Sequence, residues 1–360
     1  MIKEEGDIFF RILRYSISAD EEFPVNLSED DWTAIYETAQ KQSLLGILFY
    51  GIQKSSQQRP PRKLLLKWYA VSEQIKKRNV MINRVAVNLE KYFLENGFRT
   101  CILKGQGNIL NYPDPYIRTG GDIDIWVDGG SRKVLKYVRE RFTCSLLCYH
   151  HVDIGMYQGV EVEVHFCPIF INNLIHNWRI QRWFKEMKEE QFLHRVDLPE
   201  GTGQLCAPTN SFNRIYQMAH ISLHVFLEGI GLRQFVDYFF LLKQGFTEDE
   251  KRADERLLKR FGLYKLTSAV VWVLKEKLGL EEKYMIVPPN EKLGRFLLDE
   301  IIQGGNFGQY DQRVQRGGSQ FSQNMQRFKR DFRLMWYFPS ECLWEPVFRV
   351  YHFFWRLAHR

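Results

Sequence analysis

Asp122 and Asp124, in the sequence GGDIDIWV, are the residues whose type and spacing best fit a chemical role. On a β-strand, residues two apart face the same side, so the two carboxylates would project together while Ile123 and Ile125 face a core. Two carboxylates held side by side repel each other unless a cation lies between them. Mg²⁺ prefers such oxygen ligands and is usually completed by substrate phosphates. The pair therefore predicts a magnesium site, and the alternative is a solvated strand face.

The residues around this pair would suit a phosphate ligand. Gly120 and Gly121 precede it and remove side chains, which leaves room for a ligand or a loop. Arg118 could hold a phosphate or an acid. Further upstream, Lys104-Gly105 ends an apolar run and opens onto another glycine-containing stretch. A glycine turn that leads from a strand into a helix presents backbone N–H groups to phosphates.

A third acid comes from the sequence VEVEVHF at 160–166. Glu161, Glu163 and His165 would share one face of a strand, and the valines would share the other. A third carboxylate on a neighbouring strand would let the site hold two metal ions, roughly 3.5–4 Å apart, for in-line displacement at phosphorus. Strand periodicity alone does not choose between Glu161 and Glu163.

The elements that must position these residues form a small sheet domain over 98–170. Short apolar runs, strict alternation and glycine-containing breaks in this segment are typical of strands. Between the last two runs, Gln158-Gly159 predicts a hairpin turn. The expected elements are strands at 98–105, 122–127, 143–157 and 160–166, and a helix from Arg132 to Arg141 capped by Ser131.

Helical spacing dominates on both sides of this segment. Residues 1–97 would be a helical region that ends in a long helix from Leu64 to Leu94. Residues 171–300 would form a helical domain, and residues 301–360 a Gly/Gln-rich loop followed by basic and aromatic helices. We therefore expect an α+β fold, in which a small mixed β-sheet domain is flanked by N-terminal and C-terminal helical regions.

The composition is that of a soluble globular protein. The 360 residues are 45% hydrophobic and 26% charged, and the net charge of +7 gives only a mild bias towards anionic partners. Six cysteines in a chain of this length do not make a disulfide framework. The acidic start MIKEEGDIFFRIL lacks the form of a signal peptide, and no apolar stretch approaches the roughly 18 residues of a membrane span. We expect a cytoplasmic protein without a membrane span.

Several of these motifs, taken in order, resemble those of a known family. They are Lys104-Gly105, Tyr112-Pro113-Asp114-Pro115, Arg118, Asp122-Ile123-Asp124, Val162-Glu163-Val164-His165, the stretch from Glu228 to Asp237, and the stretch from Gly304 to Gly308. This set is similar to an uncharacterised branch of the polymerase-β-like nucleotidyltransferases, and it extends over most of the chain. The resemblance implies a small mixed sheet flanked by helices, two divalent cations, and transfer of a nucleoside monophosphate from an NTP with release of pyrophosphate.

The resemblance also implies roles for individual residues. Asp122 and Asp124 would be paired metal ligands. Glu163, two residues before His165, would be the third acid, which orients or deprotonates the acceptor hydroxyl. The residues expected to contact the nucleotide or its Mg²⁺ ions are Lys104, Gly105, Arg118, Gly120, Gly121, His165 and Arg233.

The chain departs from the family at the phosphate turn. That turn usually carries Gly-Gly or Gly-Ser, whereas this chain has Lys104-Gly105-Gln106-Gly107. Either Lys104 and Arg118 hold the triphosphate in its place, or triphosphate handling has been lost.

Two predictions for function follow from these alternatives. The first is a metal-dependent nucleotidyltransferase that moves a nucleoside monophosphate from an NTP to an unknown acceptor hydroxyl on a small molecule, a sugar or a protein. Transfer of AMP to a protein is one form of this chemistry. The second is a non-catalytic module that binds a nucleotide or nucleic acid on a degenerate nucleotidyltransferase fold, with nucleic acid the less favoured ligand.

A cysteine and histidine cluster invites a zinc interpretation. Cys144 and Cys148, with His150 and His151, have a spacing that fits no common zinc site. On an extended strand the two thiols would also be too far apart for one ion. Packed thiols are therefore the preferred interpretation.

Two helical pairs and one basic segment have both structural and functional interpretations. His220 and His224 would share a helix face, where they either hydrogen-bond structurally or line a cleft facing the sheet. Arg233 and Asp237, four apart, could pair with each other, or Arg233 could reach a phosphate. The C-terminal end could bind an anionic surface or single-stranded nucleic acid, or form a solvated face over an aromatic stripe. Its residues are Arg316, Arg327, Lys329, Arg330, Arg333, Phe328, Phe332, Trp336 and Tyr337.

Overall fold

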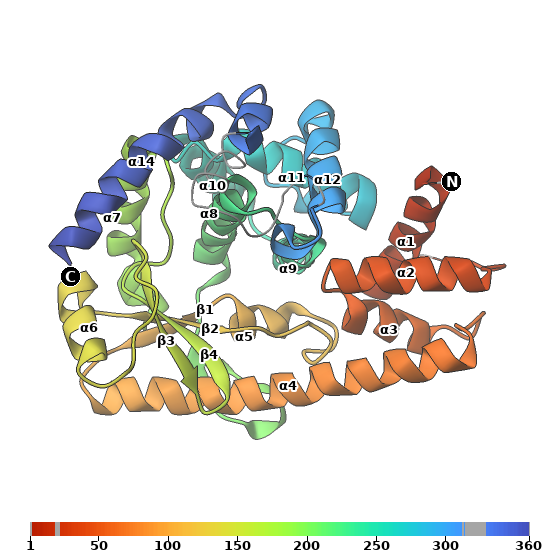
Figure 1. Ribbon diagram of the computed structural model, residues 1–360, viewed down its shortest axis with the longest axis horizontal. Coiled ribbons are helices and arrows are strands. Elements are labelled where there is room, and N and C mark those ends of the chain that lie inside the picture. The colour runs from red at the N-terminus through yellow and green to blue at the C-terminus, as the bar shows by residue number, and fades with distance from the viewer. Residues whose placement is uncertain (1, 19–21, 312, 314–328, 360) are drawn as a thin grey trace.

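A computed structural model describes residues 2–18, 22–311, 313 and 329–359. Its centre is a four-stranded sheet in the order β1-β2-β4-β3, set among helices (Figure 1). The strands are β1 (Thr100–Leu103), β2 (Ile123–Val127), β3 (His151–Tyr157) and β4 (Val160–His165). β2 runs parallel to β4, while the other two pairings are antiparallel. The predicted α+β class with a small mixed sheet is confirmed.

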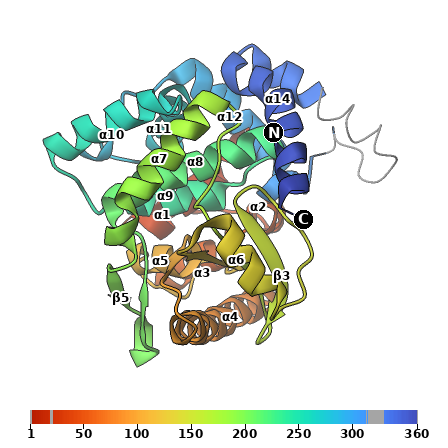
Figure 2. The same cartoon turned by 90° about the vertical axis from the view of Figure 1, so that its left-hand side faces the viewer.

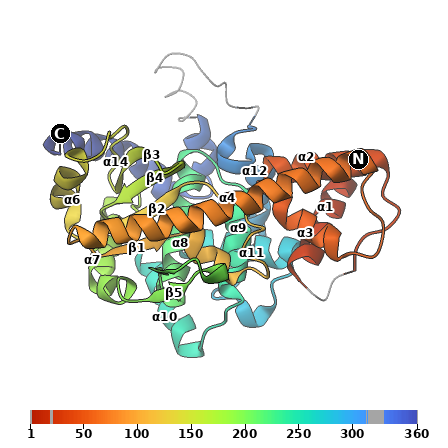
Figure 3. The same cartoon turned by 90° about the horizontal axis from the view of Figure 1, so that it is seen from below.

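The helices before the sheet end in one long element. They are α1 (Ile2–Ile17), α2 (Glu29–Lys41), α3 (Leu45–Lys54) and α4 (Arg62–Glu95). A capping box between Ser28 and Asp31 starts α2, which satisfies backbone N–H groups that would otherwise lack partners. The predicted long helix is confirmed as α4, which ends at Glu95 and is followed at Gly97 by left-handed backbone (φ 79°). Figure 3 shows α4 running along the molecule from α1–α3 to the sheet.

The segments after the sheet are mostly helical and cover it from the side opposite α4 (Figure 2). The helices are α7 (Leu174–Gln191), α8 (Asn210–Leu227), α9 (Leu232–Leu242), α10 (Glu248–Arg260), α11 (Tyr264–Leu278), α12 (Glu291–Gly304) and α14 (Pro339–Ala358), with a further helical turn over 329–335. Short 3-10 turns are η1 (Ile109–Asn111), η2 (Pro199–Gly201), η3 (Glu282–Tyr284) and η4 (Asn306–Gly308). Within the described ranges, no helix is both long and apolar enough to cross a membrane.

Two details differ from the sequence prediction in this region. A small hairpin of β5 (Arg195–Asp197) and β6 (Gln204–Cys206) interrupts the segment expected to be helical. α12 continues to Gly304, four residues into the segment expected to be a loop. Arg316, Arg327 and Phe328 lie outside the described residues.

The sheet has one face on α4 and one face towards the C-terminal helices. Ile123, Ile125 and Val127 of β2 belong to a hydrophobic cluster with α4 residues such as Ile82 and Phe93. Full burial of each such side chain stabilises the fold by about 1.5–3 kcal/mol. On the other face, Trp126 packs against Phe192 and Phe212, with ring centroids 4.7 and 6.1 Å away. The alternation read from β2 therefore sets which residues face the helices α7 and α8.

Near the sheet, two of the sequence predictions are wrong and one is confirmed. The expected strand at 143–157 begins only at His151, because 143–150 is irregular apart from a bridge between Leu147 and Val152. The helix between β2 and β3 is α6 (Gly130–Arg139), and its N-cap is Gly129. Ser131 was therefore wrong as the cap, and its Oγ lies 3.2 Å from His359 Nε2. The turn at Gln158-Gly159 is confirmed, and positive φ angles of 48° and 84° suit a tight hairpin.

Candidate active site

A cavity of about 830 Å³ lies between the sheet and the C-terminal helices. Its floor comes from the ends of β1, β2 and β4, and α5 (Gly105–Asn108) begins at its edge. Its walls come from α8, α9, α14 and the residues that lead into β3. A cavity of this size can enclose most of a nucleotide-sized ligand.

Strand register places the third acid beside the aspartate pair. Asp124 on β2 lies opposite Glu163 on β4, and Glu163 lies opposite Asp153 on β3. Asp124, Glu163 and His165 each bring a potential ligand atom within 4.8 Å of the others. Glu161 is exposed and lies two residues before Glu163 on β4, opposite Met156. The geometry therefore favours Glu163 over Glu161 as the acid adjacent to Asp124.

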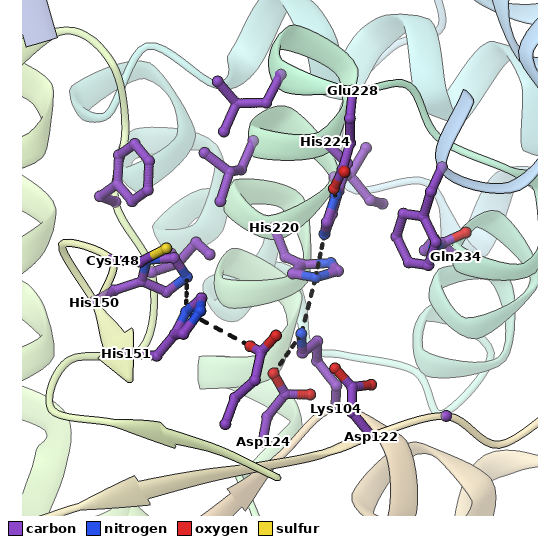
Figure 4. Close-up of a pocket in the computed structure, with 18 of the residues that line it drawn as sticks. Lys104, Asp122, Asp124, Cys148, His150, His151, His220, His224, Glu228 and Gln234 are labelled. Carbon is purple, nitrogen blue, oxygen red and sulfur yellow. Dashed lines mark hydrogen bonds and ion pairs between the residues drawn. The ribbon is translucent and has the colours of Figure 1, made fainter. Parts of the chain in front are cut away.

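Asp122 reaches the same cavity from the residue before β2 (Figure 4). Both contacts that Asp124 makes with cationic groups use its Oδ1, which leaves Oδ2 for a cation. A donor set of carboxylate oxygens beside an open cavity is the kind that Mg²⁺ prefers. Asp122 and Asp124 thus fit a magnesium ion, although Asp122 is not among the residues whose ligand atoms converge with Glu163.

Lys104 places a positive charge among these acids. Its Nζ lies 2.7 Å from Asp124 Oδ1 and 3.1 Å from His220 Nε2. Burial alone would lower the pKa of Lys104, but the carboxylates of Asp124 and Asp122 outweigh it and raise the pKa. The backbone of Lys104 is left-handed (φ 52°), a conformation that costs free energy for a residue with a side chain. The ammonium group is therefore held in the cavity as a cation.

His165 contacts two of the acids, Asp124 and Glu163. Its Nε2 lies 3.0 Å from Asp124 Oδ1 and 3.3 Å from Glu163 Oε2. Burial opposes a charge on His165, yet these two carboxylates raise its pKa to about 9. Burial likewise opposes a charge on Glu163, but its hydrogen bond to His165 and its cationic neighbours lower its pKa to about 2. Glu163 is therefore ionised at neutral pH.

Of the two partners predicted for Arg118, a phosphate or an acid, the structure shows an acid. Arg118 is 5% exposed, and its Nε and Nη2 donate to the two carboxylate oxygens of Asp237 at 2.7 and 2.8 Å. Tyr112 Oη donates to the same carboxylate at 2.6 Å. Burial would raise the pKa of Asp237, but the adjacent Arg118 guanidinium outweighs it and lowers the pKa. Arg118 lines the cavity, but this buried pair engages it, so it is a poor candidate for holding a phosphate.

Arg233 is the cation of the cavity wall with unused hydrogen-bonding capacity. Its predicted pairing with Asp237 is replaced by the pair between Arg118 and Asp237. Arg233 Nη1 donates to the Thr119 carbonyl at 3.0 Å, and its guanidinium lies 5.7 Å from the centre of the Phe307 ring. Its Nε is buried without a partner among the described residues. A buried donor without a partner is costly, so this position suits an anionic ligand.

The three glycines predicted to contact the nucleotide, Gly105, Gly120 and Gly121, have different structural roles. Gly105 lines the cavity with a positive φ of 34°. A Cβ on Gly120 would lie 2.7 Å from Ile82 Cδ1, so Gly120 is required by packing on α4. A Cβ on Gly121 would meet nothing within 4 Å, and this residue lines the cavity. Of this pair, only Gly121 leaves room for a ligand.

Sequence reasoning missed a chain of polar contacts on the helical wall. His220 and His224 line the cavity, with their Nε2 atoms 2.8 Å apart. His224 Nδ1 lies 2.7 Å from Glu228 Oε1. Figure 4 shows this chain continuing from Lys104. The histidines therefore line the cleft and also hydrogen-bond to each other, so both interpretations of the pair apply.

Asp153 on β3 was also missed, and His150 and His151 were considered only for a zinc site with the cysteines. All three residues line the cavity, and His151 and Asp153 share the face that carries Glu163 and His165. The alternation in His151-Val152-Asp153 was the available signal, because it repeats the pattern of Glu163-Val164-His165.

The C-terminal basic residues do not act as one surface. Arg330 lines the cavity, whereas Arg333 pairs with Glu300 at 2.9 Å. The Tyr337 ring stacks on Phe296 with centroids 3.9 Å apart, while Trp336 is 80% exposed. Binding of nucleic acid by this segment stays a prediction.

A mixed sheet that carries carboxylates on two adjacent parallel strands, beneath a cavity, is the arrangement implied by the sequence resemblance to nucleotidyltransferases. The chain belongs to the family described as uncharacterised nucleotidyltransferases, which matches residues 28–279. It is therefore a nucleotidyltransferase by family and by fold class.

Among solved structures, the chain is similar to an antigenic nucleotidyltransferase-like protein from Paracoccidioides brasiliensis. The sequence identity is 11%, the match covers 60% of this chain and 97% of the other, and the TM-score is 0.32. No curated protein matches the chain.

Proposed function

We propose that the cavity is the active site of a metal-dependent nucleotidyltransferase, which moves a nucleoside monophosphate from an NTP to an acceptor hydroxyl. The observation that carries the proposal is the in-register pairing of Asp124 with Glu163 beneath the cavity. Asp122, two residues before Asp124, lines the same cavity. Ionised acids converging on a cavity are unfavourable unless cations balance them. A dication and a bound triphosphate would complete this balance.

Asp122, Asp124 and Glu163 would hold the Mg²⁺ ions, two in number by the resemblance. Bound Mg²⁺ would neutralise charge on the triphosphate and favour departure of pyrophosphate. The pKa of about 2 makes Glu163 a weak base, so its role would be to bind and orient rather than to take the hydroxyl proton.

The cations of the cavity would bind the triphosphate. Lys104 Nζ reaches the acids from the end of β1, where the family's phosphate turn would lie. Arg233 has a buried Nε without a partner in the described part of the chain. Positive charge from both sides would stabilise the charge that develops on the phosphates during transfer. Gly121 would leave room for the nucleotide, because no atom lies where its Cβ would be.

A direct assay tests the proposal. The full chain is incubated with Mg²⁺ and each α-labelled NTP, with and without a cell extract as a source of acceptors. Pyrophosphate release and label on an acceptor are then measured. We expect both with the wild type and with Glu161→Gln, and neither with Asp122→Asn/Asp124→Asn or after chelation of Mg²⁺. Full activity of the double variant would contradict the proposal.

A non-catalytic nucleotide-binding module is the second candidate. It is favoured by the engagement of Arg118 with Asp237, which removes one cation that could replace the missing serine of the phosphate turn. Calorimetry separates the candidates. Nucleotide binding that needs Mg²⁺ and is lost in Asp124→Ala supports the enzyme, whereas binding without metal supports the module. The acceptor, including a protein acceptor for AMP, and a cytoplasmic location stay predictions.

A further inference from the structure

Three histidines converge at the β3 side of the cavity. His150 and His151 lie at the start of β3, and His151 is paired in register with His165 on β4. Their ring centroids are 4.3 to 5.2 Å apart, and each ring offers a nitrogen within 4.8 Å of the others. All three side chains are buried, with exposures of 6%, 7% and 1%. Three imidazoles packed this closely need either shared protons or a common ion.

The contacts of His151 direct one ring nitrogen towards a carboxylate and the other towards His150. Its Nε2 lies 3.1 Å from Asp153 Oδ1, within ion-pair distance. Its Nδ1 faces His150 Nε2 at 3.0 Å. An imidazole held by a carboxylate through one nitrogen, with the other nitrogen directed at an ion, is the usual arrangement around histidine ligands of metals.

Spacing and polarity at this cluster suit a transition-metal ion. Two ligands of a tetrahedral Zn²⁺ ion, each about 2.05 Å from the metal, lie about 3.3 Å apart. The 3.0 Å between His150 Nε2 and His151 Nδ1 is close to this value, as is the 3.5 Å between His151 Nδ1 and Glu163 Oε2. Imidazole nitrogens favour zinc, iron, nickel and copper ions over Mg²⁺.

The cluster also has unsatisfied polar atoms and balancing charge. The Nδ1 atoms of His150 and His165 are buried and have no hydrogen-bond partner among the described residues. Buried polar atoms of this kind call for a ligand or a water molecule. Asp153 and Glu163 stand on either side of His151, so their negative charge would offset that of a dication. His150 and His151 line the cavity, which gives an ion a route of entry (Figure 4).

We propose that His150, His151 and His165 form a binding site for a transition-metal dication of the Zn²⁺ type. This site adjoins the proposed Mg²⁺ ligands, because His165 Nε2 lies 3.0 Å from Asp124 Oδ1. Three protein ligands leave a fourth position of a tetrahedral ion for a water molecule or a substrate atom. The cavity would then bind two kinds of ion. Carboxylates at and just before β2 would bind Mg²⁺, and imidazoles at the start of β3 and on β4 would bind the transition metal.

Zinc binding by the untagged full chain tests this proposal without any nucleotide, so its outcome is independent of transfer activity. The chain is stripped with a chelator and titrated with Zn²⁺ against a chromophoric competitor, with Mg²⁺ in excess throughout. We expect one Zn²⁺ per chain. Co²⁺ in its place should give the intense visible absorption of a tetrahedral site with nitrogen ligands.

Variants locate the ion. His150→Gln should weaken Zn²⁺ binding by at least about 100-fold, and Asp153→Asn, which only loosens His151, by about 10–100-fold. His224→Gln and Asp122→Asn are the matched controls, because they alter other polar residues of the same cavity, and they should bind Zn²⁺ within a few-fold of wild type. Circular dichroism checks each fold, and Asp153→Asn decides the matter if His150→Gln fails to fold.

Several results would overturn the site. One is a wild-type chain that binds no Zn²⁺ against the competitor. Another is unchanged affinity in both His150→Gln and Asp153→Asn. A loss of binding in His224→Gln or Asp122→Asn would assign the ion to the α8 histidines or to the carboxylate pair instead.

Discussion

On β2 and β4, every second residue packs towards α4, and the residues between them face the C-terminal helices or the cavity. Ile123, Ile125 and Val164 are at most 1% exposed and pack among apolar side chains. Asp124 and His165, on the same strands, are also nearly inaccessible, at 3% and 1%, yet they are titratable groups whose polar atoms lie 3.0 Å apart. Burial of apolar groups stabilises the fold, whereas burial of charge is tolerated only with partners. The cavity face is thus held by mutual compensation of charges.

The largest effect is expected where one partner of a buried pair is removed from the cavity wall. Asp237→Asn would leave Arg118 buried without its carboxylate, and we expect unfolding to become easier by about 3–5 kcal/mol. Denaturant titration measures this. Tyr112→Phe, which removes only one donor to Asp237, should cost about 1–2 kcal/mol. Equal losses in the two variants would contradict the charge argument.

The same pair should make stability depend on pH. The pKa of Asp237 is lower in the folded chain than its ordinary value, so its contribution is fully present above that value, near pH 4. The contribution is lost as pH falls towards the folded pKa. The difference in unfolding free energy between wild type and Asp237→Asn should therefore shrink as pH falls below about 4. A constant difference over this range would show that the pair is not ionic.

The packed face should respond to loss of volume. Ile125→Ala would open a cavity between β2 and α4, and we expect a loss of about 2–5 kcal/mol in unfolding free energy. Transfer activity per folded molecule should stay near wild type, because the side chain faces away from the cavity. Activity that falls further than the folded fraction would break the division between the two faces.

The cavity face should respond in activity rather than stability. Glu163→Gln should lower the transfer rate by on the order of 10²-fold, because it removes one charge from the acids that hold the cations. Glu161→Gln is the matched control on the same strand face, and it should leave the rate unchanged because Glu161 is exposed. Thermal unfolding of both variants shows whether the rates compare intact folds. Equal rates would remove the distinction between the two acids.

The smallest effect concerns the glycine pair before β2. Gly120→Ala would place a Cβ 2.7 Å from Ile82 Cδ1, and we expect a cost of about 1–3 kcal/mol from overpacking. Gly121→Ala meets no atom within 4 Å and should leave stability unchanged while weakening nucleotide binding. Thermal unfolding and calorimetry measure the two quantities. A similar stability loss in both would contradict the assignment of Gly120 to packing.

The sequence predicts the strand of Asp124, the hairpin at Gln158-Gly159 and the long α4, because these depend on local periodicity and turn chemistry. It does not predict the partner of Arg118, since Asp237 lies 119 positions away and Arg233 is the nearer candidate. It also leaves Glu161 and Glu163 equivalent, because only pairing with β2 distinguishes them. The local sequence pattern thus predicts which face of a strand or helix a side chain occupies. The residue that this side chain contacts depends on tertiary structure, which the pattern does not show.

α4 contributes buried side chains to two hydrophobic clusters. Trp68, near its beginning, belongs to the larger cluster around the N-terminal and C-terminal helices, while Ile82 and Phe93 belong to the cluster beneath the sheet. Its 34 residues span about 51 Å at 1.5 Å per residue. Fraying of this rod would expose apolar surface in both clusters at once. The chain should therefore melt in a single cooperative step, with the floor of the cavity and the N-terminal helices lost together.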